Sequence, residues 1–589
     1  MRHDLHSLLH QDDYRLFRGQ VAEWAAKAYK ASLDTGELTR MDEFKDHGML
    51  AWDFLSQEFG GTKLAKTAMQ QKSREAVAAK AIGAMFEQMH KPNLSKTGVN
   101  TALGFNFYDL RGPVSFLYPV NTPFRNGMAR HGRVNAGVGT AAHWMATKNP
   151  GVIYGGVSEG NRNAFASPDN NQYMAAYKEI GGERDVTFTA EFAGEGFTDN
   201  LADEHIRGLH TLFLQEEGML LNGNSGTSGV GFKLGTPAAP TNTRSSATSG
   251  GFGSTTYVSA CVVYLTGMGN PNNTQYGYGV FPTTTAGLTP NYKRTNADGS
   301  VDIIAGGMSA VSAMSAVVTC DSTHQTTVLT VPSGTKGVYG YAWFVNTTDQ
   351  TNPSLANAYL AAITQNPTYT VTAAATGTQT AAATGLSTDN SYQMLDFDGL
   401  LTYAASNGYW KDMNGSSLTS QKNGRCTEVE TALQYLFDNY QAPVDAIWGS
   451  SDAVESLDAA VRYSGTNASG FQFIATRNEQ GNLLGGFLVS AYQSRFAVAN
   501  PMGANAIPIR IHPMIPKGTL FFDISTNPYP HSRIPFVRGL LEQRGYYSIE
   551  WPITTRQWTF GTYVHEVLQH YVPWICAVIT GIGTFNFSQ

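Results

Sequence analysis

The sequence predicts an α+β fold with an all-β domain inserted into its middle. Helix-forming residues dominate residues 1–112, a run rich in Thr, Gly, Ser and Ala fills 225–391, and helices alternate with strands from Phe397 onward. Of the 589 residues, 42% are hydrophobic, which allows a large core. Only 15% are charged, well below the roughly 25% of average domains, and small polar residues take their place. This composition favours turn-rich β structure.

The overall charge limits which partners the chain can have. A net charge of −6 and an isoelectric point of about 6.2 exclude a dominant basic surface for nucleic acid, so any contact with nucleic acid would be weak or local. The N-terminal sequence MRHDLHSLLHQDDYRLFRG has no apolar signal core, and the late apolar run 574–582 is too short to span a membrane. We therefore expect a soluble protein made in a cytoplasm, with no membrane partner.

The cysteines do not predict a metal or redox centre. The four of them are widely separated and form no CxxC motif; they are Cys261, Cys320, Cys426 and Cys576. Free buried thiols are the favoured interpretation, and a Cys261–Cys320 pair stays open as the alternative.

The N-terminal region is predicted to be helical in two stretches, 14–33 and 63–89. The second stretch carries several Lys and Arg residues. We interpret them as a solvated helix face, with an arm that touches an acidic partner or nucleic acid as the alternative. The following segment, 113–145, contains three prolines, which fix φ and remove a donor; they are Pro113, Pro119 and Pro123. This segment is predicted to be extended chain.

Residues 146–195 are predicted to form a long two-stranded loop. The central sequence GGVSEGNRNAFASPDNNQ has few apolar residues to bury, and the return arm 185–192 alternates Val186, Phe188, Ala190 and Phe192 on one face. A disordered surface loop is the alternative. Such a loop cannot bury much against its own subunit, so we expect it to contact a neighbour. The candidate contact residues are Tyr154, Glu159, Arg162, Phe165, Asp169 and Tyr173.

A helix is predicted over 201–221. Asp199 is a good N-cap, and Asn222-Gly223 is a good stop. At about 1.5 Å per residue this helix would be roughly 30 Å long. The predicted apolar stripe consists of Ile206, Leu209, Phe213 and Leu220.

The composition changes at Ser225, and strand-like runs follow at 257–265, 326–331, 338–346 and 368–372. Their spacing predicts an inserted β-sandwich of immunoglobulin or fibronectin type, with 372–385 as the returning linker. From Phe397 the chain is predicted to be α/β. Its helices lie within 397–410, 426–440 and 450–464, and its strands at 442–448, 507–511 and 518–524. Two further strand-like runs, 546–551 and 560–579, end the chain, the second broken at Pro573.

No pattern predicts catalysis, a cofactor or a metal ion. His565, Glu566 and His570 place the two histidines five residues apart instead of the four that a zinc-protease helix requires, and their flanks favour a strand. Gly137, Gly139 and Ala142 imitate a dinucleotide fingerprint without the strand and helix around it. Asp396 and Asp398 are better explained by the N-terminus of a helix. The sequence contains no GxSxG motif, no P-loop and no EF-hand loop.

Three segments in order resemble the major capsid proteins of tailed bacteriophages. The entry YPVNTPFRNGMARHGRV resembles the start of their capsid core. The run 186–224, with Phe197-Thr198-Asp199 and Leu220-Leu221-Asn222-Gly223-Asn224, resembles their extended loop returning into the spine helix. The segment TFGTYVHEVLQHYVPWICAVITGI resembles their closing peripheral strand. The resemblance covers about 113–224 and 395–585.

The resemblance implies the tailed-phage capsid fold, also called the Johnson fold. The β-rich insertion departs from its minimal form. The implied segments are the N-terminal helical arm 1–112, the entry segment 113–145, the extended loop 146–195, the spine helix of the peripheral domain 196–224, the inserted β-sandwich-like domain 225–391, the axial domain 392–535 and the peripheral-domain closing strands 536–589.

The resemblance also implies a structural, non-enzymatic function. The chain would self-assemble as hexamers and pentamers into an icosahedral head around double-stranded DNA, which it would contact non-specifically on the inner surface. Portal and scaffolding or decoration proteins would be its other partners. It would be located in the virion, after assembly in the cytoplasm of a host bacterium.

Two other classes of function stay open beside this one. An encapsulin-like nanocompartment shell would have the same fold. A cell-surface β-sandwich adhesin that binds carbohydrate would use exposed aromatic residues of the insertion, for which Tyr276, Tyr278 and Trp343 are candidates. A hydrolase would require acids or histidines clustered in a pocket, which the sequence does not show.

Overall fold

The computed structural model divides the chain into two compact units, Met1–Leu110 and Arg111–Gln589. The described residues all belong to the second unit. They are 122–131, 139–149, 151, 155–194, 199–227, 229–269, 288–296, 298–332, 334–375, 377–421, 425–462, 489–494, 496, 505–529, 534 and 536–583. The helices predicted at 14–33 and 63–89 lie outside them. None of the helices in the described part is long and apolar enough to cross a membrane.

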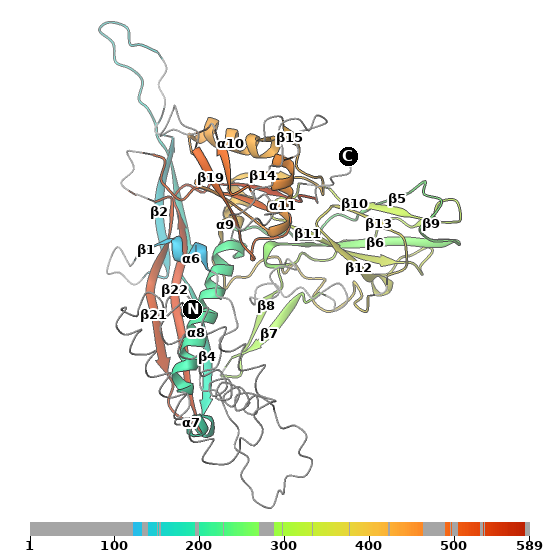
Figure 1. The fold of residues 1–589 in the computed structure, drawn as a ribbon, viewed down its shortest axis with the longest axis horizontal. Coiled ribbons are helices and arrows are strands. Elements are labelled where there is room, and N and C mark those ends of the chain that lie inside the picture. Colours follow the sequence, from blue (N-terminus) through green and yellow to red (C-terminus); the bar gives the residue numbers. More distant parts are fainter. Residues whose placement is uncertain are drawn as a thin grey trace, which may run out of the picture. The chain divides into compact units, whose positions relative to one another are not determined.

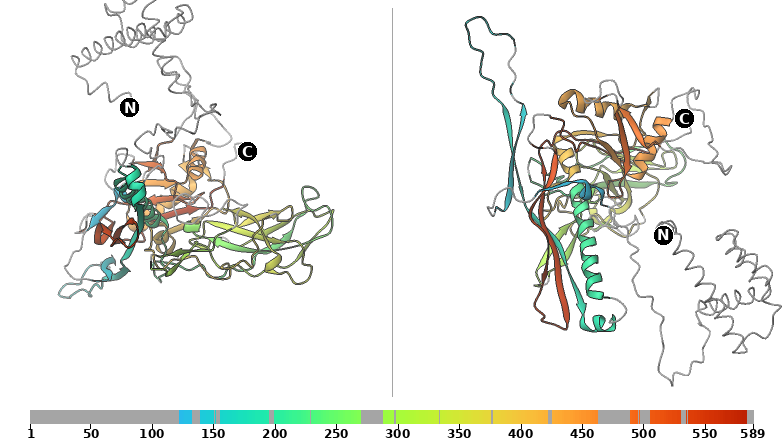
Figure 2. Two further views of the ribbon diagram at one scale, coloured as in Figure 1. Left: turned by 90° about the horizontal axis from the view of Figure 1, so that it is seen from below. Right: turned by 60° about the vertical axis from the view of Figure 1, so that its left-hand side comes forward.

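A four-stranded sheet and one long helix form the first layer of the second unit (Figure 1). The strands lie in the order β1 (Ala129–His131), β21 (Arg538–Glu550), β22 (Gln557–His570) and β4 (Lys178–Thr187). β1 pairs with β21 in parallel, and the other pairs are antiparallel. Helix α8 (Asn200–Asn222) packs on β4 and β22, along the sheet, as the right-hand view of Figure 2 shows.

Helix α8 confirms the predicted boundaries. The Asp199 carboxylate accepts a hydrogen bond from the Ala202 N–H at 3.0 Å, and the Gly223 N–H donates to the Met219 carbonyl at 2.9 Å. The predicted stripe was wrong at Ile206, whose side chain is 49% exposed. The buried residues are concentrated in the second half of the helix, because only that half is also covered by α6 and α9.

The entry segment contains a short helix where extended chain was predicted. Helix α6 (Pro123–Gly127) has Pro123 at its first position, where a helix needs no N–H donor and the fixed φ of proline is already helical. The proline therefore begins a helical turn at this position instead of preventing it. Its Phe124 side chain is buried in the main core.

The return arm predicted at 185–192 was also wrong. The long hairpin consists of β2 (Ala141–Asn149) and β3 (Asp169–Ala176), and residues 185–187 end β4. Helix α7 (Phe188–Gly194) follows, with the Ala190 N–H donating to the Thr187 hydroxyl at 3.3 Å. The alternating pattern ends at Thr187 because this hydroxyl begins a helix there.

A six-stranded sheet forms the second layer and confirms the α/β prediction. The strands lie in the order β14 (Tyr409–Asp412), β23 (Ala577–Thr580), β20 (Leu520–Asp523), β17 (Ala446–Gly449), β19 (Asn505–Ile511) and β18 (Ala491–Ser494). Its helices are α9 (Leu400–Asn407), α10 (Thr427–Tyr440) and α11 (Ser451–Arg462). The prediction that all of 536–589 forms closing strands beside α8 was wrong for β23. After the Pro573 break this strand joins β14 and β20 in the second sheet.

The insertion contains two antiparallel sheets with a shared core. One sheet has the order β13 (Thr368–Val371), β10 (Thr327–Thr330) and β5 (Thr241–Arg244). The other has β12 (Tyr359–Thr364), β11 (Gly340–Asn346), β6 (Thr256–Leu265) and β9 (Val318–Cys320). Leu329 and Val371 from the first sheet pack with Trp343 from the second. Four of these strands match the predicted runs. The hairpin of β7 (Asn291–Thr295) and β8 (Val301–Ala305) lies outside both sheets.

The two ends of the insertion lie side by side. The Gln393 N–H donates to the Asn224 carbonyl at 2.8 Å, and the Gly399 N–H donates to the Gly223 carbonyl at 2.8 Å. The Asn224 amide also donates to the Ser391 carbonyl at 2.9 Å. The chain therefore leaves α8 and returns to α9 at one place, as an insertion requires.

A serine repeat completes one edge of β6. Ser309, Ser312 and Ser315 each donate a backbone N–H to a β6 carbonyl, at 2.7–3.0 Å. Their hydroxyls accept the N–H of the same β6 residues, which are Tyr264, Val262 and Ala260, at 2.8–2.9 Å. β9 pairs only with the first residues of β6, 256–258. The motif SAVSAMS therefore provides hydrogen-bond partners for the backbone groups along the rest of that β6 edge.

Replacing Ser312 by Ala is expected to lower the free energy of unfolding by about 1–3 kcal/mol, because the buried Val262 N–H loses its acceptor. Urea denaturation followed by tryptophan fluorescence measures the change, since Trp343 lies in the same domain core. Ser322→Ala, at an exposed turn, is the control and should change stability by less than about 0.5 kcal/mol. Equal stability of the two variants would contradict the role of the repeat.

Candidate functional site

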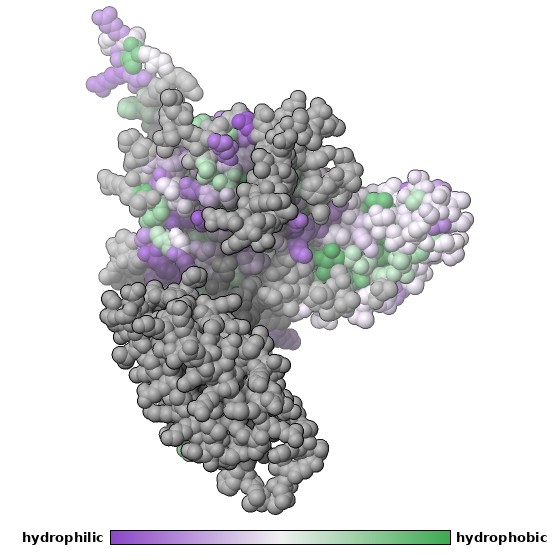
Figure 3. Space-filling model, viewed as in Figure 1, coloured by the Kyte–Doolittle hydropathy of each residue, from purple (hydrophilic) through white to green (hydrophobic). Residues whose placement is uncertain are grey.

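The long hairpin of β2 and β3 presents a surface that its own chain does not cover. The strands pair from Ala141↔Ala176 to Asn149↔Asp169, and every residue from 155 to 170 is exposed. Figure 1 shows this hairpin extending away from both sheets, and Figure 3 shows its end as mainly hydrophilic surface. We name residues 155–168 the hairpin tip.

The candidate contact residues divide between the tip and the root of the hairpin. Glu159, Arg162 and Phe165 lie in the tip, and the Phe165 ring is 102% exposed. Asp169 is the exposed first residue of β3. Tyr173 is instead half-buried at the root, with its ring stacked on Trp144 at 5.9 Å. Tyr154 lies outside the described residues.

The two faces of the hairpin differ in burial. Trp144 and Ala142 are buried on one face, opposite Tyr173 and Ala175. The other face carries two exposed methionines, Met145 at 64% and Met174 at 62%. Methionine side chains adapt to different partners, so this face suits a contact with another molecule.

The root of the hairpin is hydrogen-bonded to β21 and β22, and its two strands are joined to each other at the start of the hairpin. The Trp144 indole N–H donates to the His570 carbonyl at 3.0 Å in a buried position. The Gln543 amide donates to the Gly139 carbonyl at 2.8 Å, and the Tyr177 N–H donates to the Thr140 carbonyl at 3.1 Å. A fixed root and an exposed tip allow the hairpin to present its tip in a defined direction.

A buried charged cluster holds the entry segment on α8 and on the first sheet. The Glu216 carboxylate, which is fully buried on α8, accepts hydrogen bonds from Arg125, Arg130 and the Tyr546 hydroxyl. Arg130 also donates to Glu542 at 2.8 Å and to Glu566 at 3.1 Å. The Arg125 guanidinium lies 3.6 Å from the centre of the Phe213 ring. We name Arg125, Arg130, Glu216, Glu542, Tyr546 and Glu566 the charged cluster.

A second buried carboxylate holds helix α6 in place. Glu217 accepts the Phe124 N–H at 3.0 Å and the Arg125 N–H at 2.7 Å, which are otherwise unsatisfied donors at the start of α6. The His512 ring lies 2.9 Å from the same carboxylate and comes from the second layer. Glu216 and Glu217 together therefore connect the entry segment to both sheets.

Burial shifts the pKa of two groups in the charged cluster. Glu566 has no exposed surface, and this burial raises the pKa of its carboxyl to about 7; the guanidinium of Arg130 opposes the shift and the neighbouring Glu542 adds to it. Burial likewise raises the pKa of the Tyr546 phenol to about 12. One Glu566 oxygen, Oε1, has no hydrogen-bond partner.

The far end of the first sheet carries a second exposed surface, which is apolar. Phe188 packs against Trp558, with ring centres 5.3 Å apart, and Phe192 of α7 is 78% exposed. Trp551 and Ile553, in and beside the turn from β21 to β22, are also exposed. Large exposed apolar side chains in one region indicate a contact with another molecule.

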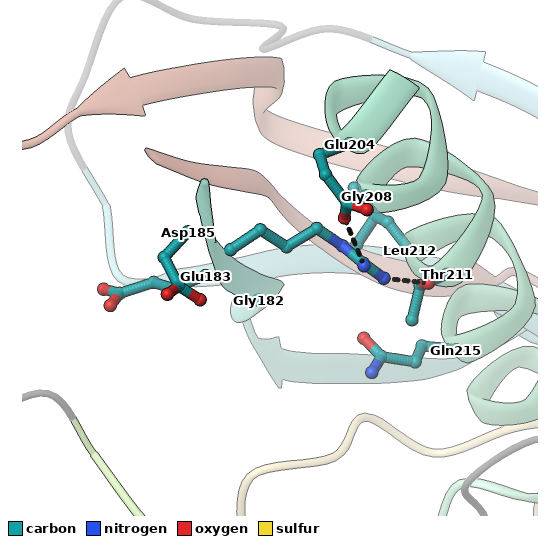
Figure 4. A pocket seen from close by; sticks show the side chains of 9 residues that line it. Gly182, Glu183, Asp185, Glu204, Gly208, Thr211, Leu212 and Gln215 are labelled. Carbon is teal, nitrogen blue, oxygen red and sulfur yellow. Dashed lines mark hydrogen bonds and ion pairs between the residues drawn. The ribbon is translucent and has the colours of Figure 1, made fainter. Parts of the chain in front are cut away.

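A polar cavity of about 430 Å³ lies between β4 and α8 (Figure 4). Its central residue is Arg184, which donates to Glu204 at 3.0 Å and to the Thr211 hydroxyl at 2.7 Å. The other lining residues are Gly182, Glu183, Asp185, Gly208, Leu212 and Gln215. The cavity contains no nucleophile paired with a base. Its hydrogen bonds join the helix to the sheet.

The residues considered for a metal site do not converge. His565 lies 3.1 Å from Glu179 and 2.6 Å from the Tyr547 hydroxyl, whereas Glu566 points into the charged cluster. His570 is fully buried, and this burial lowers its pKa to about 3. Among the described residues, no group of three His, Cys, Asp or Glu side chains could hold a metal ion.

The structure tests two sequence-based interpretations. All four cysteines are free and buried, which confirms the favoured interpretation and excludes the alternative Cys261–Cys320 disulfide in this structure. Trp343 has no exposed surface, so it cannot serve as a carbohydrate platform; Tyr276 and Tyr278 lie outside the described residues.

Comparison with known proteins adds relatives at the level of structure. No protein-family model matches the sequence, and no curated protein matches it. The capsid asymmetric unit of cyanophage A-1(L) matches over 81% of this chain and 97% of that chain, at 10% identity and a TM-score of 0.35. A structure from Mycobacterium phage Bobi matches over 82% and 96%, at 6% identity and a TM-score of 0.34.

The chain is similar to tailed-phage capsid structures. An encapsulin complex from Synechococcus elongatus PCC 7942 is also similar, over 83% of this chain and 96% of that chain, at 8% identity and a TM-score of 0.32.

The charged cluster was not predicted from the sequence. Two of its members that share a hydrogen bond, Arg130 and Glu566, lie 436 residues apart, and each charged member looks like an ordinary surface charge in its local context. The only available signal was the pair Glu216-Glu217 next to the apolar end of a predicted helix, where carboxylates are rarely buried without partners.

Proposed function

We propose that this chain is a major capsid protein, a structural shell subunit that self-assembles as hexamers and pentamers into an icosahedral head around double-stranded DNA. The observation that carries the proposal is the hairpin tip, which is exposed throughout and joined to a fixed root. A segment of this kind loses conformational freedom without burying surface in its own subunit, so its stabilisation has to come from a neighbour.

The other exposed surfaces support the same proposal. The methionine face of the hairpin and the apolar end of the first sheet are separate surfaces, so one subunit can contact several copies at once. Many modest contacts add up when they are closed into a ring or a shell. The low share of charged residues suits broad contacts between identical subunits.

The proposed role is non-enzymatic. Several strongly shifted titratable groups, including Glu566, Tyr546 and His570, lie inside the fold and bind its segments together. The proposed partners besides the chain itself are DNA on the inner surface, a portal, and scaffolding or decoration proteins. The inserted domain, whose surface is pale and sparsely charged in Figure 3, is proposed to face outward as a decoration of the head. The proposed location is the virion, after assembly in the bacterial cytoplasm.

Negative-stain electron microscopy of the purified, recombinant full-length chain tests the proposal. Closed shells or capsomer rings are the expected result. Nuclease treatment of particles isolated from the natural source then separates the two kinds of shell, because a virus head protects double-stranded DNA and an encapsulin-like compartment does not. A chain that stays monomeric at high concentration, with and without co-expressed neighbouring genes, would contradict a shell function.

A further inference from the structure

The charged cluster has more negative than positive groups when all of its carboxyls are ionised. Two guanidinium groups, from Arg125 of α6 and Arg130 of β1, face three carboxyl groups. The carboxyls come from Glu216 of α8, Glu542 of β21 and Glu566 of β22. A single proton on one carboxyl would balance the charge.

Glu566 is the carboxyl best placed to hold that proton. Glu216 and Glu566 are both fully buried, but Glu216 accepts three hydrogen bonds, whereas Glu566 accepts one and leaves Oε1 without a partner. Glu542 is the most exposed of the three. A buried carboxylate oxygen without a donor is costly, and protonation removes most of that cost.

No further cation reaches Glu566 from the neighbouring strand. Across the sheet, Glu566 lies between Glu542 of β21 and Lys178 of β4. The Lys178 ammonium, however, donates to the Met394 carbonyl. The charged and titratable groups that face Glu566 are therefore those of the cluster, with Tyr546 as the only phenol among them.

We propose that Glu566 is a proton-binding latch that holds residues 122–131 of the entry segment on α8 and on the first sheet. With the proton bound, two carboxylates balance two guanidinium groups, and β1 stays paired with β21. Without it, an ionised carboxylate with one unpaired oxygen is buried beside Glu542, so an opened state in which water solvates Glu566 becomes easier to reach. Since the entry segment carries the chain into the hairpin, the latch also controls how firmly the hairpin root is held.

The direction of the pH effect follows from the raised pKa. Glu566 keeps its proton in the closed state up to about pH 7, whereas in an opened state it ionises near its ordinary value of 4.5. Opening of the entry segment therefore becomes easier as the pH rises from about 4.5 to about 7, by up to about tenfold for each pH unit. Above pH 7 both states are ionised, and the effect levels off.

Amide hydrogen exchange on the full-length chain tests the latch, with exchange corrected for the intrinsic pH dependence. We expect the protection of 122–131 and of its partner residues 539–541 to fall about 100-fold more in the wild type than in Glu566→Gln between pH 5 and pH 7.5. The glutamine keeps the shape of the protonated acid but cannot ionise. Glu204→Gln removes the α8 carboxylate that pairs with Arg184, outside the cluster, and should behave like the wild type.

A second variant keeps the inference testable if Glu566→Gln does not fold. Glu542→Gln leaves Glu566 in place and removes the neighbouring charge that raises its pKa, so the fall in protection should end at a lower pH. Profiles that coincide for the wild type and every folded cluster variant would overturn the latch.

The exchange measurement does not depend on the proposed function, because it reads local opening in the chain itself. Only the consequence for assembly rests on a shell function. If the pH-dependent opening is observed but the chain never assembles, the shell function is contradicted and the latch is supported. If shells form but the opening does not depend on pH, the latch is contradicted and the shell function is supported.

Discussion

A variant in which the hairpin tip, residues 155–168, is replaced by a short Gly-Ser turn is expected to fold normally and to form no closed shells. The replaced residues are all exposed, and β3 begins only at Asp169, so the paired strands and the root keep their contacts. The free energy of unfolding should change by no more than about 0.5 kcal/mol, as is usual for surface changes. Thermal unfolding and negative-stain microscopy of the same preparation measure the two properties.

A control change in another exposed turn shows whether the loss of assembly is specific to the hairpin tip. Replacing Asp298 by Gly, in the exposed turn between β7 and β8, should leave assembly intact. The single change Phe165→Ser should weaken assembly without abolishing it, because one fully exposed ring would be buried in the contact. Shells of normal number and shape from the tip variant would show that the hairpin tip does not join the subunits.

Local signals were sufficient for elements whose ends are chemically marked. Asp199 and Gly223 fixed α8 to within one residue of its predicted ends, because a side-chain cap and a stop residue act within one helical turn. The strands β6, β10, β11 and β13 were found because runs of β-branched and aromatic residues in a small-residue context leave few alternatives.

The same signals failed where a partner elsewhere in the chain decides the structure. Pro123 was taken to exclude a helix, yet Glu217 accepts the N–H of Phe124, 93 residues earlier in the chain, and stabilises one. Residues 185–192 alternate as a strand does, but only 185–187, the end of β4, pair with another strand, which is β22. The final strand β23 was assigned to the wrong layer because nothing local distinguishes the two sheets.

The exposure of the tip was predictable from sequence because the tip has few apolar residues. A run with few apolar residues cannot be buried, whatever the rest of the chain does. The charged cluster was not predictable, since it depends on Arg130 meeting Glu216, Glu542 and Glu566 across as many as 436 residues. Exposed segments of this protein can thus be predicted from composition, whereas the interactions that position them require the fold.

Replacing Arg130 by Met is expected to cost about 3–5 kcal/mol of unfolding free energy, because three carboxyls lose a shared donor in a buried site. Methionine keeps most of the length and the apolar stem of the side chain, so the loss reflects charge and hydrogen bonding more than packing. Urea denaturation at pH 7.5 gives the magnitude. Repeating it at pH 5.5 should give a smaller loss, since Glu566 is then protonated in the wild type as well as in the variant.

Arg184→Met is the matched control for this effect. Arg184 also projects from a strand of the first sheet to a glutamate on α8, at 3.0 Å, but both side chains are partly exposed. A pair of this kind contributes at most about 1 kcal/mol, because water screens the charges and solvates whichever partner remains. If the two variants lost the same amount, the charged cluster would be no more than another surface pair. A loss at Arg130 several times larger, and larger at the higher pH, would identify the cluster as the interaction that holds the entry segment in place.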